Sequence, residues 1–246
     1  MFSLSVRIAF LLLLFCCENL LMSCSDDTIA PVVNAWYQAR PESNRYVVRQ
    51  GDTIYSIAWS FGLDYRLLAE ANHLNPPYTV TPGQHLVMTY TPAGQMKSQQ
   101  PQPQLTRQLP QTIQKKPHAE WQHVILNSRW NWPTRGRIIQ GYSRSQIGHP
   151  GISIAGRLGS PIRAAASGTV VYSGDGVRGY GNLIIIKHNE SYLSAYAFNQ
   201  RNLVRVGERV HAGTVIARMG QNDAGHTLLY FEIRRDGIPV NPLKYL

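Results

Sequence analysis

Residues 148–171 read GHPGISIAGRLGSPIRAAASGTVV, a stretch in which short β-type runs alternate with Gly and Pro turns. The alternation continues toward the C-terminus through GNLIIIKH, YLSAYAF, RVHAGTVIARMG and LLYFEIRRDGIPV. Turns that recur about every 8–12 residues, without a long helical period, are typical of an antiparallel all-β domain. We therefore expect about six short strands in the last part of the chain, residues 129–246.

These runs resemble the LytM or lysostaphin-like zinc endopeptidases, which cleave peptide cross-bridges in peptidoglycan. The resemblance rests on G-I-x-I-A-x-x-x-G-x-P-I-x-A-A-x-x-G-x-V-V, on G-Y-G-N-L-I-I-I-K-H and on V-x-A-G-x-x-I-A-x-M-G. It implies that fold for residues 129–246. Active members bind zinc through an H-x-x-x-D pair and the second His of an H-x-H. Two further histidines assist the attacking water.

When the motifs of this family are matched to the chain, the resemblance implies that one zinc ligand, His149, is retained and that other residues stand at the remaining ligand positions. Ser153 stands at the aspartate position and Tyr230 at the second His of the H-x-H. The positions of the two auxiliary histidines hold Phe198 and Leu228. Catalytic zinc needs about three strong protein ligands and an open position for water. We therefore predict that the domain has no metal or other cofactor and is not an enzyme; residual zinc endopeptidase activity is the alternative.

Other histidines could in principle supply a different metal site. His226 precedes the last long strand and is expected nearer to a loop, and His188 ends a strand and is expected to be structural. These positions do not assemble a working ligand set. We expect His149 to be a hydrogen-bonding surface residue rather than a ligand.

The replacements change the character of the former zinc groove from polar to apolar and aromatic. An exposed concave surface of that kind is typical of a protein-binding site. The alternative is that the aromatic rings fill a collapsed cavity. We predict a partner-binding groove made of His149, Ser153, Tyr196, Phe198, Leu228 and Tyr230.

A second folded region covers residues 45–89. A short β-type run begins at Tyr46, and residues 51–53 offer a turn followed by a helix N-cap. Apolar residues then recur at helical spacing until Gly62 ends the first helix, and Asp64 can cap a second helix. Pro76 and Pro77 stop that helix, and GQHLVM predicts a returning strand. The predicted order is β-α-α-β.

This order of elements and the sequence motifs within it resemble the LysM domain, which binds the N-acetylglucosamine backbone of peptidoglycan or chitin in a shallow groove. The matching runs are Y-V-V-x-x-G-D-T-I-x-x-I-A, L-A-x-x-N-x-L and P-G-Q-x-L. The turn residues could also serve only as turn and cap. The resemblance places the glycan groove at Gly51, Asp52, Thr53, Ile54, Asn75, Pro76 and Tyr78.

The remaining segments indicate export and tethering. Residues 1–23 have an early Arg and a long apolar run, as in a signal peptide, and Leu21-Met22-Ser23-Cys24 resembles a bacterial lipobox. In that family the Cys is acylated; the alternative is an ordinary signal peptide with an incidental Cys24. A Ser at position 25 resembles the outer-membrane default. We predict a leash over residues 24–44 and an unfolded Gln/Pro-rich linker over residues 90–128.

A formal net charge of +10 favours anionic partners, and a periplasmic location excludes nucleic acid. A LysM domain followed by a degenerate LytM domain on a lipoprotein resembles the NlpD-type activators of cell-division amidases, as do the runs RGYGNLIIIKHN and YLSAYA. The resemblance implies an α+β multidomain lipoprotein anchored in the outer membrane and facing the periplasm. Its partners would be peptidoglycan, the membrane and an N-acetylmuramoyl-L-alanine amidase. A structural wall-binding tether is the alternative.

Overall fold

The computed structural model describes residues 44–88, 130–143 and 150–246. All of them fall within the compact unit Asn34–Leu246. Cys24, His149, the predicted signal peptide, the linker and all of the predicted leash except its last residue, Asn44, lie outside the described residues. Within the described ranges, no helix is long and apolar enough to span a bilayer.

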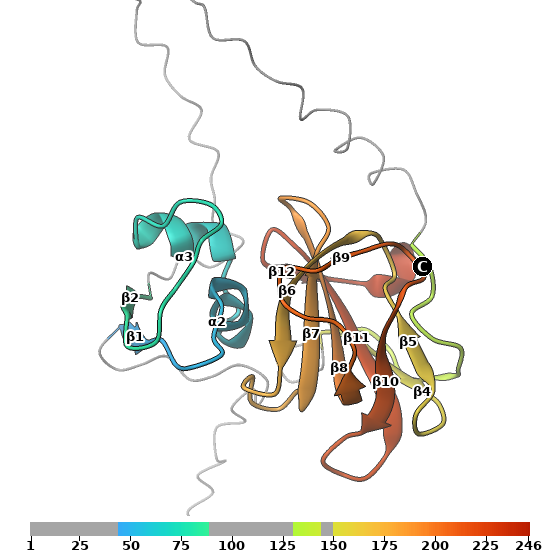
Figure 1. Ribbon diagram of the computed structural model, residues 1–246. Helices are drawn as coiled ribbons and strands as arrows, with labels where there is room; N and C mark the ends of the chain where they lie inside the picture. The colour runs from blue at the N-terminus through green and yellow to red at the C-terminus, as the bar shows by residue number, and fades with distance from the viewer. Residues whose placement is uncertain (1–43, 89–129, 144–149) are drawn as a thin grey trace, which may run out of the picture. The chain divides into compact units, whose positions relative to one another are not determined.

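The N-terminal domain has the predicted β-α-α-β order (Figure 1). Its two strands pair antiparallel, with Tyr46 opposite Leu86. The buried faces of both helices pack around Trp59, Leu68 and Leu86, all at most 1% exposed. The elements are β1 (Arg45–Val47), α2 (Ile54–Phe61), α3 (Tyr65–Ala71) and β2 (His85–Val87).

Local sequence sets the helix ends in this domain. Thr53 caps α2 because its side chain accepts a hydrogen bond from the Ser56 amide, and the Ser56 hydroxyl accepts one from the Thr53 amide. Gly62 ends α2 in the left-handed conformation at φ 65°. The Asp64 carboxylate accepts from the Arg66 amide and so caps α3. All three residues have the roles that the sequence predicted.

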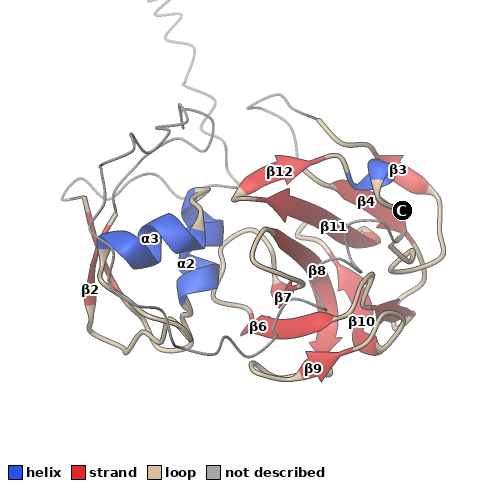
Figure 2. Ribbon diagram, turned by 90° about the horizontal axis from the view of Figure 1, so that it is seen from above, coloured by secondary structure: helices blue, strands red, loops and turns tan. Residues whose placement is uncertain are grey.

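The C-terminal domain is one antiparallel sheet in which neighbouring strands follow the order β3-β4-β11-β10-β8-β7-β6-β9 (Figures 1 and 2). β12 and β8 also pair with β11, and β5 pairs with β10. The strands are β3 (Ile138–Gln140), β4 (Ile152–Ala155), β5 (Pro161–Arg163), β6 (Gly168–Gly174), β7 (Asn182–Lys187), β8 (Tyr192–Asn202), β9 (Arg209–Val210), β10 (Val215–Gln221), β11 (Thr227–Arg235) and β12 (Ile238–Val240).

The all-β class is confirmed, but the described residues of this sheet contain ten strands rather than about six. The additional strands are short: β3, β5 and β12 have three residues each and β9 has two. A two- or three-residue strand carries too little alternation to be recognised in sequence. The sequence therefore underestimated the strand number.

The sheet is buried on both faces, because two apolar cores share its strands. One core contains Ile152, Ile184 and Phe231 together with Trp130. The other contains Leu183, Ile185 and Tyr230 and continues into the buried side chains of the N-terminal domain. Successive strand residues point to opposite faces, so a strand between two cores is apolar throughout. This explains the unbroken run in β7.

Candidate functional site

Three of the residues predicted to form the groove come together on one face of the sheet. In the register of β4 and β11, Ser153 lies opposite Tyr230, and Leu228 lies opposite Ala155. Directly opposed residues share a face, and residues two apart on a strand do as well. Ser153, Leu228 and Tyr230 therefore lie together, as the resemblance implied.

Tyr230 is held as a neutral phenol. Its hydroxyl donates a hydrogen bond of 2.8 Å to Oε2 of Glu232. Burial, followed by the nearby Glu232 carboxylate, raises the pKa of Tyr230 well above its ordinary value. A side chain that resists losing its proton cannot supply the anionic oxygen that a strong metal ligand would require. The phenol instead joins the packing and hydrogen bonding of the core.

Phe198 reaches the same core through an unusual backbone conformation. Its φ is 61°, in the left-handed region, and its amide donates a 2.9 Å hydrogen bond to the carbonyl of Tyr180. The ring lies 6.4 Å from that of Tyr230, edge to face, and the Tyr180 ring lies 5.8 Å from Tyr230. Three aromatic rings thus gather around the position of the second H-x-H residue.

Tyr196 does not belong to this groove, which corrects the sequence-based assignment. Ala197 lies opposite Tyr230, so its neighbour Tyr196 points to the other face of the sheet. There its ring packs 5.2 Å from that of Phe231, and its hydroxyl accepts a hydrogen bond from the Ala165 amide. The left-handed backbone at Phe198 breaks the alternation that the sequence would suggest.

The apolar replacements are buried. Phe198, Leu228 and Tyr230 are 6%, 4% and 0% exposed, and Ser153 is 5% exposed. The side chains of Phe198, Leu228 and Tyr230 belong to the core shared with the N-terminal domain. The exposed aromatic surface that the sequence suggested is not present among the described residues in this arrangement, and the alternative, filling of the former cavity, matches these burial values.

These side chains do not fit a zinc ion. Leu228 and Phe198 have no donor atom, the Tyr230 phenol is committed to Glu232, and the Ser153 hydroxyl lies 3.5 Å from Oε1 of Gln140. Among the residues described, no group of three or more His, Cys, Asp and Glu side chains is placed to hold a metal. Neutral hydroxyls are poor substitutes for the nitrogen, sulfur and carboxylate ligands of zinc.

His188, the structural candidate, is buried in a hydrogen-bond network on the opposite face. Its Nδ1 lies 2.8 Å from the carbonyl oxygen of Ser167 and its Nε2 lies 2.7 Å from the Ser194 hydroxyl. Burial lowers the pKa of His188 to about 4. The other histidine that was considered, His226, is exposed, and its amide donates to Asn222 Oδ1.

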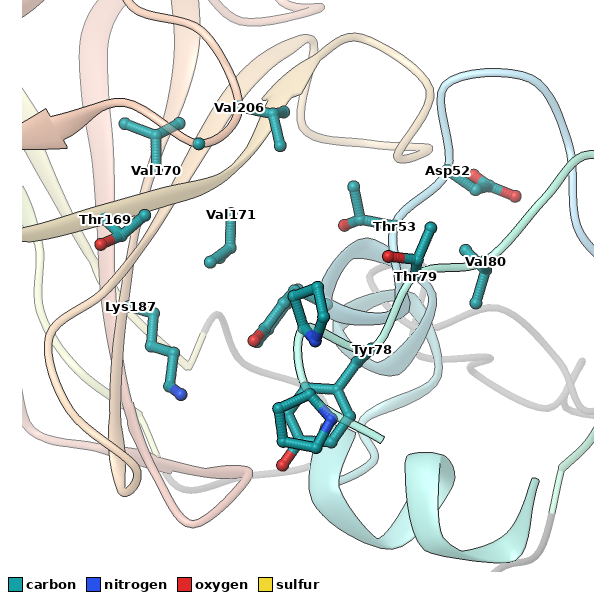
Figure 3. Close-up of a pocket in the computed structure, with 14 residues that line it drawn as sticks. Asp52, Thr53, Tyr78, Thr79, Val80, Thr169, Val170, Val171, Lys187 and Val206 are labelled. Carbon is teal, nitrogen blue, oxygen red and sulfur yellow. The ribbon is translucent and has the colours of Figure 1, made fainter. Parts of the chain in front are cut away.

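The predicted glycan residues of the N-terminal domain divide into two groups. Asp52, Thr53, Pro76 and Tyr78 line a cavity of ≈ 470 Å³ (Figure 3). The other three are not part of its lining: Gly51 forms the turn, Ile54 is 1% exposed in the core, and Asn75 accepts a hydrogen bond from the Tyr78 amide. Four of the seven residues predicted to bind glycan therefore line this cavity, and the other three do not.

Within this cavity, Asp52 contributes little through its carboxylate. Oδ2 of Asp52 accepts hydrogen bonds from the Tyr46 hydroxyl at 2.7 Å and from the Arg49 amide at 2.8 Å. Figure 3 shows the carboxylate turned away from the other labelled side chains. The Tyr78 ring and the Thr53 side chain are closer to the centre of the group in the same view.

Comparison with known proteins supports the assignment of both domains. The LysM domain profile matches residues 46–89, and that of peptidase family M23 matches residues 147–242. A lipoprotein NlpD/LppB homologue of Pseudomonas aeruginosa is 40% identical over 83% of this chain and 77% of its own length. The chain belongs to the NlpD/LppB family of lipoproteins.

Two further relatives come from Escherichia coli. The uncharacterized lipoprotein YgeR is 40% identical, with coverage of 82% of this chain and 80% of its own length. The murein hydrolase activator NlpD is 37% identical, with coverage of 82% of this chain and 67% of its own length.

In this NlpD/LppB-family protein, the structure identifies two further residues near the groove that the sequence analysis missed. Glu232 and Arg234 are a buried ion pair, with Nε of Arg234 2.6 Å from Oε1 of Glu232. Nη1 of Arg234 donates at 3.1 Å to the backbone carbonyl of Trp59 in the LysM domain. One feature of the sequence could have revealed this pair. Glu232 and Arg234 follow Leu228 and Tyr230 at alternate positions, so the charged side chains continue the same buried face of the strand.

Proposed function

We propose that this NlpD/LppB-family protein is a non-catalytic, peptidoglycan-binding lipoprotein that activates an N-acetylmuramoyl-L-alanine amidase. The observation that supports this most directly is the loss of zinc chemistry on an intact M23 sheet. Ser153 and Tyr230 still lie opposite one another, but the phenol donates to Glu232. Relatives of the same family are named murein hydrolase activators.

The other parts of the proposal concern location and wall binding. Lipidation at Cys24 would anchor the protein in the outer membrane with its folded domains facing the periplasm. The LysM domain, over about residues 45–89, would bind the wall, and the linker over residues 90–128 would let the M23 domain reach a partner.

Activation then requires only differential binding. An amidase that occludes its own active site exists in closed and open states. A protein that binds the open state more tightly shifts the population toward it by the ratio of the two affinities. The partner would use the region around the former zinc positions. Because Phe198 and Tyr230 are buried, we place the contact on the less buried rim, which includes Gln140.

The test is release of dye from labelled sacculi by the purified mature chain, alone and with each periplasmic amidase of the same organism. We expect no release by the chain alone, and release above the amidase's own rate in one mixture. Release by the chain alone would identify a hydrolase. Unchanged release in every mixture would overturn activation and favour a structural wall tether, the reading that burial of the groove residues supports.

A matched pair of variants locates the contact. Gln140 lies beside Ser153 at the end of β3, whereas Ile139 lies at the register shift between Ile138 and Gln140 and is 43% exposed. We expect Gln140→Arg to reduce stimulation of the amidase at least tenfold and Ile139→Arg to leave it unchanged. Equal stimulation by both variants would place the contact elsewhere.

A further inference from the structure

The cavity at the predicted glycan groove has walls from both domains. The LysM domain contributes Thr53, Pro76 and Tyr78. The M23 domain contributes Thr169 and Val171 of β6, Lys187 of β7, and Val206 of the loop that follows β8. Figure 3 shows the M23 side chains on one side of the hollow and the LysM side chains on the other. Both groups belong to the compact unit Asn34–Leu246.

Specific contacts hold these walls together. The guanidinium carbon of Arg234 lies 3.6 Å from the centroid of the Trp59 ring. Nη2 of Arg66 lies 2.8 Å from Oδ1 of Asp236. The Tyr65 hydroxyl donates at 3.2 Å to Glu190, whose other carboxylate oxygen lies 2.6 Å from Nζ of Lys187. Glu190 thus links Lys187, a wall residue of the M23 domain, to Tyr65 at the start of helix α3.

The glycine that follows Asp236 fits this contact closely. A Cβ at Gly237 would lie 2.9 Å from the backbone nitrogen of Asp64 in the LysM domain. The glycine also has a φ of 77°, which other residues adopt only with strain. The M23 turn therefore approaches the start of α3 at a distance that only a residue without a side chain permits.

The chemistry of the cavity suits a neutral, amphipathic ring. Its volume of ≈ 470 Å³ lies in the usual range for small-molecule sites, about 300–1,000 Å³. The rings of Pro76, Pro77 and Tyr78 and the methyl groups of Val171 and Val206 offer apolar surface to sugar C–H groups. The hydroxyls of Thr53 and Thr169 and the Lys187 ammonium add a few polar atoms around it.

We propose that the glycan site of this protein is composite, with the M23 domain forming one wall of the LysM groove. This inference rests on the proposed wall binding by the LysM domain. The ligand is the N-acetylated glycan backbone of peptidoglycan, which sits between Tyr78 and the β6–β7 face. Glycan binding then favours the docked arrangement of the two domains, because the ligand contacts both walls and binds that arrangement more tightly.

Val206 provides the sharpest test, because it lies in the M23 domain and its side chain is 55% exposed. A substitution there therefore leaves both cores intact. We would make Val206→Glu and Val206→Arg, so that an effect of shape can be separated from an effect of charge. The matched controls are Leu158→Glu and Leu158→Arg, at an M23 position that is 56% exposed and outside the cavity lining.

The measurement is the affinity of the mature chain and its variants for N-acetylglucosamine oligomers by titration calorimetry. We expect both Val206 variants to weaken binding at least tenfold and both Leu158 variants to bind as the unmodified chain does. Unchanged affinity in the Val206 variants would overturn the composite site while leaving glycan binding by the LysM domain intact. Absence of binding by the unmodified chain would overturn the composite site as well. The proposal that the protein activates an amidase would be unaffected by that result, because the sacculus assay tests it separately.

Discussion

The guanidinium of Arg234 stacks on the indole of Trp59, with 3.6 Å between the guanidinium carbon and the ring centroid. The two residues lie 175 positions apart in the chain. Arg234 also pairs with Glu232, and Glu232 accepts from the Tyr230 hydroxyl. A continuous series of contacts thus joins Tyr230, which stands at a predicted zinc-ligand position, to a helix of the LysM domain.

This relationship predicts a large cost for removing the arginine. Arg234→Met leaves the Glu232 carboxylate buried without its cation, and breaking a buried pair in this way costs about 3–5 kcal/mol. Urea denaturation followed by circular dichroism would measure the loss. The matched control is Arg235→Met on the next residue, which is exposed, and we expect a change within about 0.5 kcal/mol there. Equal, small effects at both positions would contradict the role of Arg234.

At Phe198 we expect glycine to be a more stable replacement than alanine, which reverses the usual order. A bulky residue at φ 61° is strained, and glycine adopts that conformation freely. Both Phe198→Ala and Phe198→Gly lose the ring contact with Tyr230, but only alanine keeps the backbone penalty. We expect the glycine variant to be about 1 kcal/mol more stable than the alanine variant in urea denaturation.

The control for that comparison is Leu203, a partly exposed residue that has no positive φ. There glycine should be the less stable of the two replacements, by about 0.5–1 kcal/mol. If alanine were the better residue at both positions, the backbone at Phe198 would not be strained.

Local features of this fold could be predicted from the sequence because their causes lie within a few residues. The caps at Thr53, Gly62 and Asp64 depend on hydrogen bonds across one helical turn, and the structure has all three. The antiparallel class also followed from turn spacing, and Gly181, with φ 54°, lies in one of these Gly-containing turns, before β7. The family pattern also predicts which side chains stand at the zinc-ligand positions, and that assignment stays a prediction.

The remaining features depend on contacts between distant parts of the chain. The groove predicted from the sequence included Tyr196, but the left-handed backbone of Phe198 interrupts the strand alternation and Tyr196 lies on the other face of the sheet. The core that the groove residues share with the N-terminal domain and the pairing of Arg234 with Trp59 both depend on packing of the two domains. Neither hydrophobic periodicity nor motif spacing carries that information.

The positions opposite one another on β4 and β11 predict that zinc binding can be rebuilt. Ser153→Asp with Tyr230→His restores two ligand types on facing residues, and His149 completes the set that the family pattern requires. After equilibration with zinc and dialysis, we expect below about 0.1 zinc per unmodified chain and about one per doubly substituted chain, measured by mass spectrometry of the metal.

The single substitution Ser153→Asp is the control and should stay near the unmodified value, because two ligands hold zinc poorly. About one zinc per unmodified chain would show that the ligand positions were wrongly identified. A doubly substituted chain that folds but stays free of zinc would show that the facing pair lies outside the former metal site.

His188 predicts how stability depends on pH. Its pKa is about 4 in the folded protein and about 6.5 in the unfolded chain, because burial disfavours the charged ring. Between these values the unfolded chain binds a proton that the folded protein does not, so the free energy of unfolding decreases as the pH falls. The loss begins near pH 6.5 and reaches about 2 kcal/mol at pH 5.

A comparison with His188→Gln isolates this contribution from that of the carboxylates. Glutamine can still bond to the Ser167 carbonyl and the Ser194 hydroxyl but does not titrate. The variant should be less stable at pH 7, because the His188 ring packs 4.5 Å from Trp130, and the difference should shrink by about 2 kcal/mol at pH 5. A constant difference between the unmodified protein and His188→Gln would mean that burial does not disfavour the charged ring, so that the folded and unfolded chains bind the proton over the same pH range.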